Sequence, residues 1–471
     1  MDSHTLYVDL DGTFFKTDLL FESTLVLIKK NPLYLLLLIV WAIKGKAYLK
    51  SEIAKRVSLN MSVQPRNPEL YAYLSEQKSK GRKIILATAS DQRFAKQVCK
   101  STDIFDDFIA SDGKTNLSAS NKLKAIEALD PNFAYAGNSS DDLVLFAKAK
   151  QAIVVNASDS VSQKASSYQV DEEFDKKQTD LKAWVKQLRL YQWVKNCLVF
   201  VPLLVSGLFL EPTLVVNSIL AFVSFGLLAS STYIVNDLLD LESDRAHARK
   251  RNRPLAAARI SIPAGVLVAS LLFLLAFVIA FSVNIVYFGV LFAYLVLTLS
   301  YSFKLKQYIG IDVISLAALY TIRIVAGAAV LGVYVSFWLL AFSMLVFLSL
   351  ALVKRCAELK ALEKAGKESV SGRDYNSSDY TILQSFGSSS SFLSILVFSF
   401  YVNNNVMSNQ YQTPTVLWII IPALTYWLMR MWIKTHRGEM HDDPIVFSLK
   451  DKGSLITIGF MGVVTLAAQL L

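Results

Sequence analysis

The carboxyl-terminal part of this chain is a succession of apolar runs separated by short polar loops. Between Cys197 and Leu471 these runs are about 17 to 24 residues long, which is the length of helix that crosses a bilayer. Hydrophobic residues make up 53% of the chain and charged residues only 18%, so an ordinary soluble fold is excluded. An all-α membrane domain is predicted, with nine candidate spans at residues 193–210, 213–236, 262–282, 285–302, 311–333, 336–354, 388–405, 414–433 and 454–471.

Basic residues gather in every second loop of this part. Loops 237–261, 303–310, 355–387 and 434–453 hold nearly all of its Lys and Arg. By the positive-inside rule these loops face the cytoplasm, and the carboxyl terminus is expected outside. The net charge of +10 is therefore better explained by topology and by anionic lipid or phosphate than by nucleic acid.

The first 160 residues have the composition of a soluble α/β domain. We expect this domain at 1–160, a hydrated linker at 161–185 and the membrane domain at 186–471. The start lacks the layout of a cleavable signal, so the first domain is expected in the cytoplasm. From Leu181 to Trp193, Trp and Leu alternate with Lys and Arg, which favours an interfacial helix over a soluble helix packed on the first domain.

A shorter apolar run, Leu33 to Ile43, lies within the first domain and is too short to cross a bilayer. Core packing and a position on the lipid surface would both explain it. The lysines on either side favour the lipid surface. They are Lys29, Lys30, Lys44, Lys46 and Lys50.

Two carboxylates stand at the end of the first apolar strand, in Leu6-Tyr-Val-Asp9-Leu-Asp11-Gly-Thr13. The strand period places Asp9 and Asp11 on the same side. One carboxylate can attack phosphorus while the other delivers a proton to the leaving oxygen. The pair therefore indicates phosphoryl chemistry.

These residues resemble the opening motif of the haloacid dehalogenase (HAD) superfamily, over about residues 5–160. A strand ending at Thr88, then Lys122, then an acidic loop with Asn138, Asp141 and Asp142 follow in that family's order. The resemblance implies a Rossmannoid α/β phosphatase domain whose helical cap, at about 14–80, would choose the substrate. The implied roles are Asp9 as nucleophile, Asp11 as acid/base, Thr88 and Lys122 (or Lys124) as phosphoryl ligands, and Mg²⁺ on Asp9, Asp11 and either Asp141 or Asp142.

One position departs from the HAD pattern. The acidic loop reads Gly137-Asn138 where the family has Gly-Asp, which removes one negative charge from the metal shell. The amide still offers a carbonyl oxygen, so weaker Mg²⁺ binding is expected. A degenerate domain with a regulatory role is the alternative.

An acid cluster runs into a base cluster between Asn236 and Pro254, directly after the second candidate span. On one continuous helix Asp237, Asp240 and Asp244 would share a face at i, i+3 and i+7 and jointly hold Mg²⁺. The bases that follow supply the charge that phosphate oxygens require. Surface ion pairing is the alternative, but three acids at the mouth of a span favour a diphosphate site.

This acidic motif resembles the first motif of the UbiA-type prenyltransferases, which are membrane proteins of nine helical spans, over about residues 185–471. Tyr301-Ser-Phe-Lys304-Leu-Lys306 is also similar to that family. Its second Asp-rich cluster is replaced here by Lys354, Arg355 and Glu358, followed by Arg373. A donor with an extra phosphate would suit this added positive charge.

The pattern is similar to the UbiA branch that makes polyprenyl-phosphoryl-phosphoribose, typified by decaprenyl-phosphate phosphoribosyltransferases of cell-wall biosynthesis. Residues 192–196 and 436–444 also resemble that branch. The resemblance implies Mg²⁺-assisted transfer of phosphoribose from phosphoribosyl pyrophosphate (PRPP) to a polyprenyl phosphate, with Asp237 and Asp240 in the catalytic centre. An acceptor phosphate is already ionised, so no general base is required.

The resemblance also assigns binding roles. Lys195 and Arg323 are candidates for the acceptor phosphate; an ion pair of Arg323 with Asp312 or another acid is the alternative. The donor 5-phosphate would be held by Arg249, Lys250 and Arg253. The remaining substrate-binding candidates are Asn236, Tyr301, Lys304, Lys306, Lys354, Arg355 and Glu358. Lys304, Lys306 and Lys354 would alternatively only orient the chain in the membrane.

Together the two resemblances imply a bifunctional enzyme of the bacterial inner membrane. It would transfer phosphoribose and then hydrolyse the 5-phosphate, with Mg²⁺ in both domains and both sites in the cytoplasm. A homo-oligomer is compatible with the sequence. The alternatives are an aromatic-acceptor prenyltransferase that uses polyprenyl diphosphate, a lipid or ion carrier, and a non-catalytic scaffold.

Overall fold

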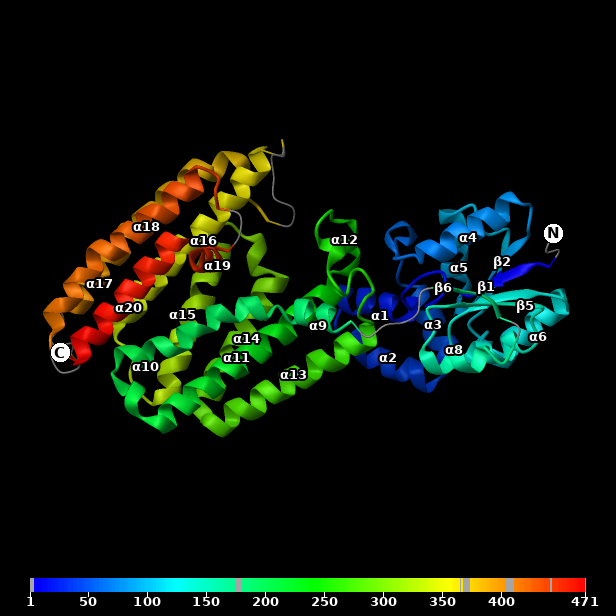
Figure 1. Ribbon diagram of the computed structural model, residues 1–471, viewed down its shortest axis with the longest axis horizontal. Helices are drawn as coiled ribbons and strands as arrows, with labels where there is room; N and C mark the ends of the chain where they lie inside the picture. The colour runs from blue at the N-terminus through cyan, green and yellow to red at the C-terminus, as the bar shows by residue number, and fades with distance from the viewer. Residues whose placement is uncertain are drawn as a thin grey trace. The chain divides into compact units, whose positions relative to one another are not determined.

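A computed structural model of the chain describes residues 4–168, 170–174, 180–364, 366, 373–403, 411–440 and 443–470 (Figure 1). Two compact units divide the chain. One comprises residues 1–188 together with 233–268, and the other comprises 189–232 together with 269–471. The first unit therefore contains the predicted soluble domain and also the acidic motif near Asp237.

A six-stranded parallel sheet forms the centre of the first unit. Its strands are β1 (Leu6–Val8), β2 (Ile84–Asp91), β3 (Asp107–Ser111), β4 (Ala134–Gly137), β5 (Gln151–Val155) and β6 (Val170–Phe174), in the order β3-β2-β1-β4-β5-β6. Leu6 and Val8 pack into the core on one face, and Tyr7 packs into the core on the other. Two buried faces explain the nearly continuous apolar strands. The strand order reverses between β1 and β4, where sheets of this kind bind ligands at the carboxyl ends of their strands.

Helices surround this sheet, as the sequence predicts for an α/β domain. Four lie between β1 and β2: α1 (Leu19–Lys30), α2 (Tyr34–Ile43), α3 (Lys46–Ala54) and α4 (Pro68–Ser79). The others are α5 (Gln92–Ser101), α6 (Ala119–Leu129), α7 (Leu143–Phe146) and α8 (Asp159–Ala165). Asp18 begins α1 by accepting a 2.7 Å hydrogen bond from the Leu20 amide, and Asn67 caps α4 directly before Pro68.

The predicted linker at 161–185 is wrong over part of its length. Helix α8 extends to Ala165, and β6 pairs with β5 as the outermost strand of the sheet. Three of the five β6 side chains are exposed, so the polar composition reflects an edge strand facing water. Residues 169 and 175–179 of the predicted linker lie outside the described residues.

Nine helical segments in the described part of the chain are long and apolar enough to cross a membrane, which confirms the predicted number. They are Leu181–Val205, α11 (Pro212–Leu239), α13 (Ile262–Val283), α14 (Ile285–Phe303), α15 (Ile311–Leu331), α16 (Phe337–Lys364), Ser377–Val402 with α17 (Tyr380–Val402), Pro414–His436 with α18 (Ile420–His436), and α20 (Lys452–Leu470). Two short helices, α12 (Leu241–Ala246) and α19 (Pro444–Lys450), lie in loops.

The first apolar segment is not one continuous α-helix. It consists of α9 (Leu181–Leu188), a 3₁₀ stretch (Leu190–Phe200) and α10 (Val201–Val205), and Arg189 between the first two has φ of 51°. Gly327 of α15 makes room for this segment, because a Cβ there would lie 2.1 Å from the Val199 carbonyl oxygen. Small residues thus permit the close helix packing that membrane domains use.

Candidate functional site

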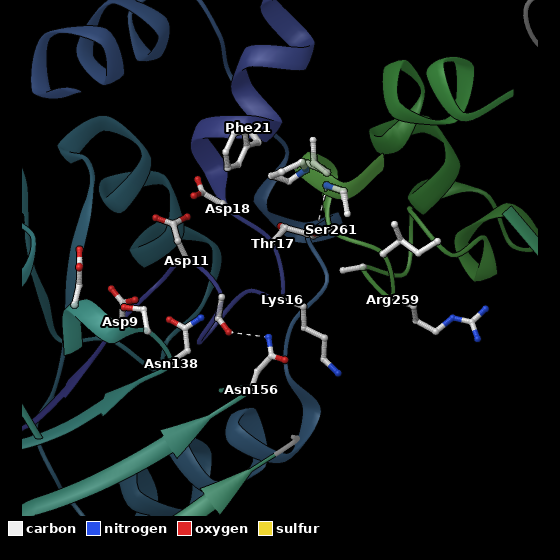
Figure 2. A pocket seen from close by; sticks show the side chains of 18 of the residues that line it. Asp9, Asp11, Lys16, Thr17, Asp18, Phe21, Asn138, Asn156, Arg259 and Ser261 are labelled. Carbon is white, nitrogen blue, oxygen red and sulfur yellow. Dashed lines mark hydrogen bonds between the residues drawn. The ribbon is translucent and has the colours of Figure 1, made fainter. Parts of the chain in front are cut away.

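The two strand-end carboxylates open into the same space in the first unit. Asp9 follows β1 directly, and Asp11 follows two residues later, before Gly12 with φ of 82°. Figure 2 shows Asp9, Asp11 and Asn138 side by side around this opening. The Asp11 carboxylate is held by two donors, the Leu19 amide at 2.8 Å and the Ser90 hydroxyl at 2.6 Å.

Lys122 of α6 contacts Asp9 of this pair. Its buried Nζ lies 2.7 Å from Asp9, 2.9 Å from the Tyr135 hydroxyl and 3.5 Å from Asp142. The structure thus brings the predicted lysine to the predicted nucleophile, whereas Lys124 is exposed. Thr88 is also nearby and buried, but its hydroxyl accepts a 3.0 Å hydrogen bond from the Ser90 amide.

The acidic loop after β4 separates its two aspartates into different environments. Both carboxylate oxygens of Asp142 are engaged, by the Tyr135 hydroxyl at 2.6 Å and by the Ser139 amide at 2.9 Å among others. Asp141 is exposed and lines the same opening as Asp9 and Asn138. Asp142 therefore has a structural role in shaping the loop, and Asp141 is the more available oxygen donor.

The pKa values of the strand-end carboxyls are displaced upward. Burial raises the pKa of Asp9 to about 7 even though Lys122 opposes the shift. Burial, assisted by the nearby charge of Asp18, raises the pKa of Asp11 to about 6. Burial lowers the pKa of Lys50, against the effect of the surrounding acids. Perturbed groups of both signs in one opening are characteristic of functional sites.

Lys50 is a residue of this site that the sequence did not reveal. The run of flanking lysines assigned it to the surroundings of the apolar stretch 33–43. In the structure α3 turns it inward, where its Nζ donates to the Ala89 carbonyl at 2.7 Å and to Asn116 at 3.2 Å. Only the packing of α3 on β2 could place it there.

The opening belongs to a cavity of about 1200 Å³ within the first unit. The acids and lysines described above line one side. Apolar residues from the start of the first span and from the beginning of α13 line another, among them Leu181, Trp184, Ile260 and Pro263. Arg259 and Ser261 stand across from the carboxylates in Figure 2. The cavity thus combines a charged end with apolar walls, which is suited to an amphiphilic ligand.

The acids after the second span do not share one helix face, and this prediction is wrong. Helix α11 ends at Leu239 and α12 begins at Leu241, so the chain turns at Asp240. Arg253 donates to Asp237 at 3.0 Å and to Asp244 at 2.6 Å, which brings these two carboxylates together. Asp240 instead pairs with Lys29 of α1 at 2.7 Å. The helical spacing holds only along an unbroken helix, and here the helix is broken.

A buried ion pair fixes α12 to the helical insertion of the sheet domain. The guanidinium of Arg245 contacts both carboxylate oxygens of Glu22 at 2.7 and 3.1 Å, and also Gln64 at 2.7 Å. Its Nε donates to the Ala256 carbonyl at 3.0 Å. Arg245 is one of the bases expected to supply positive charge to phosphate oxygens, but in the structure it is buried against Glu22. Glu22 was not predicted as a functional residue, because the pairing depends on a contact across more than 200 residues.

The other residues predicted near this motif are more accessible. Arg249 and Lys250 are exposed, and Lys250 lies 3.9 Å from Asp244. Asn236 is half-buried on α11. Gln187 of α9 donates to Asp237 at 2.8 Å. Burial raises the pKa of Asp244 even though Arg253 opposes the shift.

A second polar cluster lies among the spans of the other unit and is centred on Asp443. Lys195 lies 2.7 Å from its carboxylate, Lys354 lies 3.7 Å away and the Tyr320 hydroxyl donates at 3.1 Å. Burial tends to raise the pKa of Asp443, but Lys195 and Lys354 together lower it to about 2. The predicted motif at 436–444 contains this residue, while its residues 441 and 442 lie outside the described residues.

Arg323 joins this cluster rather than pairing with Asp312. It donates to Asn196 at 3.0 Å, to the Tyr294 hydroxyl at 3.1 Å and to the Leu319 carbonyl. The Arg323 guanidinium lies 5.6 Å from the ring centre of Tyr320, and the Lys195 ammonium lies 5.7 Å from the same ring centre. Lys195 and Arg323, the two predicted ligands of the acceptor phosphate, therefore both lie close to the ring of Tyr320.

Asp312 is instead the partner of Arg355, which is fully buried in the same unit. Arg355 also contacts Glu358 and lies 3.3 Å from the Tyr301 hydroxyl. Lys304 is exposed and Lys306 half-buried at the end of α14. Three predicted residues, Tyr301, Arg355 and Glu358, therefore form one network. It is completed by Asp312, which was considered only as a possible partner of Arg323.

Within the described residues, no group of three or more His, Cys, Asp or Glu side chains is gathered closely enough to hold a metal ion. Both predicted Mg²⁺ sites nevertheless offer the oxygen donors that this ion prefers. Asp9, Asn138 and Asp141 line one cavity. At the other site, a guanidinium nitrogen of Arg253 already lies between two carboxylates, so that pair accommodates a cation.

A comparison with family models matches residues 199–451 to the UbiA prenyltransferase family. This is more than half of the chain, which therefore belongs to that family of membrane enzymes. An uncharacterized protein of Sinorhizobium fredii, y4nM, is 35% identical over 97% of this chain and 90% of its own length. Decaprenyl-phosphate phosphoribosyltransferase of Mycolicibacterium smegmatis is 34% identical over 39% of this chain and 58% of its own length. A UbiA homologue of Archaeoglobus fulgidus, bound to GPP and Mg²⁺, matches with a TM-score of 0.46 and 16% identity over 60% of this chain and 99% of its own.

Proposed function

We propose that the membrane part transfers a 5-phosphoribosyl group from PRPP to a polyprenyl phosphate and releases pyrophosphate. The main support is the basic cluster around Asp443. Lys195 and Lys354 both lie beside the Asp443 carboxylate. The Arg323 guanidinium lies over the ring of Tyr320 in the same cluster. A phosphate monoester competing with that carboxylate would meet the same donors. The relative from Mycolicibacterium, whose name states this activity, supports the substrate class.

The donor is assigned to the acids and bases between Asn236 and Arg253. Asp237 and Asp244, with Asp240 nearby in sequence, would hold Mg²⁺, which would neutralise the diphosphate as it leaves the anomeric carbon. Arg253 now occupies the space between Asp237 and Asp244. On donor binding it would turn to the 5-phosphate together with Arg249 and Lys250, which are exposed.

Substrate pairs test this assignment directly. Purified full-length protein in lipid nanodiscs would receive either PRPP with polyprenyl phosphate, or polyprenyl diphosphate with 4-hydroxybenzoate, each with Mg²⁺. Pyrophosphate release from the first pair alone is expected. Release from the second pair alone would overturn the proposal and identify an aromatic-acceptor prenyltransferase.

We also propose that the sheet domain is a HAD-type phosphatase acting on that product. An Asp9 oxygen would attack phosphorus, the bond from phosphorus to the ribose 5-oxygen would break, and Asp11 would protonate the leaving alkoxide. Water would then hydrolyse the acyl phosphate and free inorganic phosphate. Lys122 lies against Asp9 to hold the phosphoryl oxygens. Mg²⁺ on Asp9, the Asp11 carbonyl, Asn138 and Asp141 would offset the phosphate charge.

The cavity supports a lipid-borne substrate for this step, since its walls combine the strand-end acids with Leu181 and Trp184. The expected final product is polyprenyl-phosphoryl-ribose. Mass spectrometry of the lipid products, with phosphate release measured in parallel, tests the second step. If only the 5-phosphorylated lipid accumulates with wild-type protein, the phosphatase proposal falls while the transferase proposal stands.

The basic loops give the proposed orientation. Loops 237–261, 303–310, 355–387 and 434–453, and the sheet domain, would face the cytoplasm of a bacterium, with the carboxyl terminus outside the inner membrane. The transfer would then draw on cytoplasmic PRPP, and both reactions would draw on cytoplasmic Mg²⁺.

A further inference from the structure

The first unit carries a dense exposed apolar stretch formed by Leu33 and helix α2. No residue of Tyr34–Ile43 is charged. Its exposed large apolar side chains are Leu33, Leu35, Leu36, Leu37, Ile39, Val40 and Ile43. Elsewhere between residues 4 and 168 such side chains are isolated, at Phe21, Leu129, Val144 and Tyr168. An apolar patch of this density marks a surface that meets a partner other than water.

Helix α2 is anchored to the unit by its other face. Tyr34, Leu38 and Trp41 follow one another at helical spacing and pack against the core on that side of the sheet. Trp41 is buried, and the Arg56 guanidinium lies 4.7 Å from its ring centre. One face of the helix therefore packs on the core, as one of the two predictions had it, and the opposite face is exposed in a fixed direction.

The charged residues around α2 indicate which kind of partner its exposed face would bind. From Ser23 to Ser51 the chain has five lysines and no acidic residue. Lys30, Lys44 and Lys46 are exposed at the two ends of α2. Such ends complement anionic lipid headgroups. A second copy of the chain, placed symmetrically, would bring the same lysines into opposition, and like charges would disfavour that contact.

A bilayer is always within reach of this unit, because it includes the last residues of α11 and the first residues of α13, two membrane spans. Ten residues are too few for α2 to cross that bilayer. We propose that α2 lies in the headgroup region, with its exposed apolar face in the acyl boundary, and docks the sheet domain on anionic lipid. This proposal does not depend on either proposed activity.

Nitroxide accessibility tests the docking in the full-length protein. Cys99 and Cys197 would be replaced by serine and the buried Cys356 by alanine, and a label would be placed at Leu36→Cys or Ile39→Cys. The matched reference is Ala72→Cys, an exposed position on α4. In nanodiscs of phosphatidylcholine and phosphatidylglycerol, relaxation by oxygen is compared with relaxation by a water-soluble nickel chelate.

The ratio of oxygen to nickel accessibility is expected to be at least about threefold higher at Leu36 and Ile39 than at Ala72, because oxygen partitions into the bilayer. A ratio equal to that at Ala72 would overturn the proposal. Shielding from both reagents would also overturn it, since this result means that protein covers the helix. The double variant Lys44→Gln, Lys46→Gln should lower the ratio with phosphatidylglycerol but not in pure phosphatidylcholine; equal values would overturn the role of anionic lipid.

Discussion

The strand-end acids, Asp9 and Asp11, and the helix-end acids, Asp237 and Asp244, are both carboxylate pairs with a basic side chain beside them, but they stand on different kinds of secondary structure. Asp9 and Asp11 lie just after strand β1 of the parallel sheet and line the same cavity, as their spacing in the sequence predicts. Asp237 and Asp244 stand on two helices separated at Asp240, and Arg253 bridges them. After a strand of the sheet, the acids keep the arrangement that the sequence spacing predicts. At the end of a helix, a break in the helix changes that arrangement. Charge compensation differs as well, by a buried lysine in the first case and by a half-exposed arginine in the second.

Removing the strand-end nucleophile should have the largest effect. Asp9→Asn should reduce phosphate release by at least about 1,000-fold, because no other group can form the covalent intermediate. Pyrophosphate release should remain near wild type, so the 5-phosphorylated lipid should accumulate, as seen by mass spectrometry. Products identical to those of wild type would remove the phosphatase assignment. Asp107→Asn, an exposed aspartate on β3, is the control.

Glu22→Gln tests the ion pair that joins the insertion to α12. Both partners are buried, and loss of one leaves the Arg245 charge uncompensated, which typically costs about 3 kcal/mol. Hydrogen exchange of the α12 amides should become faster by the factor that corresponds to this loss of free energy. The exposed Glu69→Gln on α4 should leave exchange unchanged. Unchanged exchange in Glu22→Gln would show that the pair contributes little to fixing α12.

At the helix end, Asp244→Asn should slow pyrophosphate release by about 100-fold, since one oxygen ligand and one charge are lost from the proposed Mg²⁺ site. Glu242→Gln, an exposed position two residues earlier, should retain activity. The rate is measured at saturating PRPP over a range of Mg²⁺ concentrations. Equal loss in both variants would point to a general disturbance of the loop.

The smallest effect is expected from the bridging arginine. Arg253→Gln leaves Asp237 and Asp244 close together without their cation, at a cost of about 1 kcal/mol. The thermal midpoint in EDTA should fall, and Mg²⁺ should restore it more in this variant than in wild type. Arg251→Gln is the exposed control on the same loop. Absence of any Mg²⁺ effect would argue against a cation site at this pair.

Features that depend on local patterns along the chain could be predicted from the sequence. Features that depend on tertiary contacts between distant segments could not. The nine apolar segments and the strand that leads into Asp9 follow from apolar runs, and Lys122 follows from motif order. The turn at Asp240 was missed because Leu-Leu-Asp-Leu-Glu contains no Gly or Pro to signal a break. Lys50, Asp443 and the pairing of Glu22 with Arg245 depend on contacts between distant segments, which no spacing records.

The close fit of Gly12 against Asn138 has a consequence for how this domain can change over generations. A Cβ on residue 12 would lie 2.0 Å from the Asn138 amide nitrogen, so neither position can grow independently. Asparagine and aspartate have nearly the same shape and their codons differ by a single base. A lineage can therefore switch the charge of this pocket back and forth in one mutational step without repacking it.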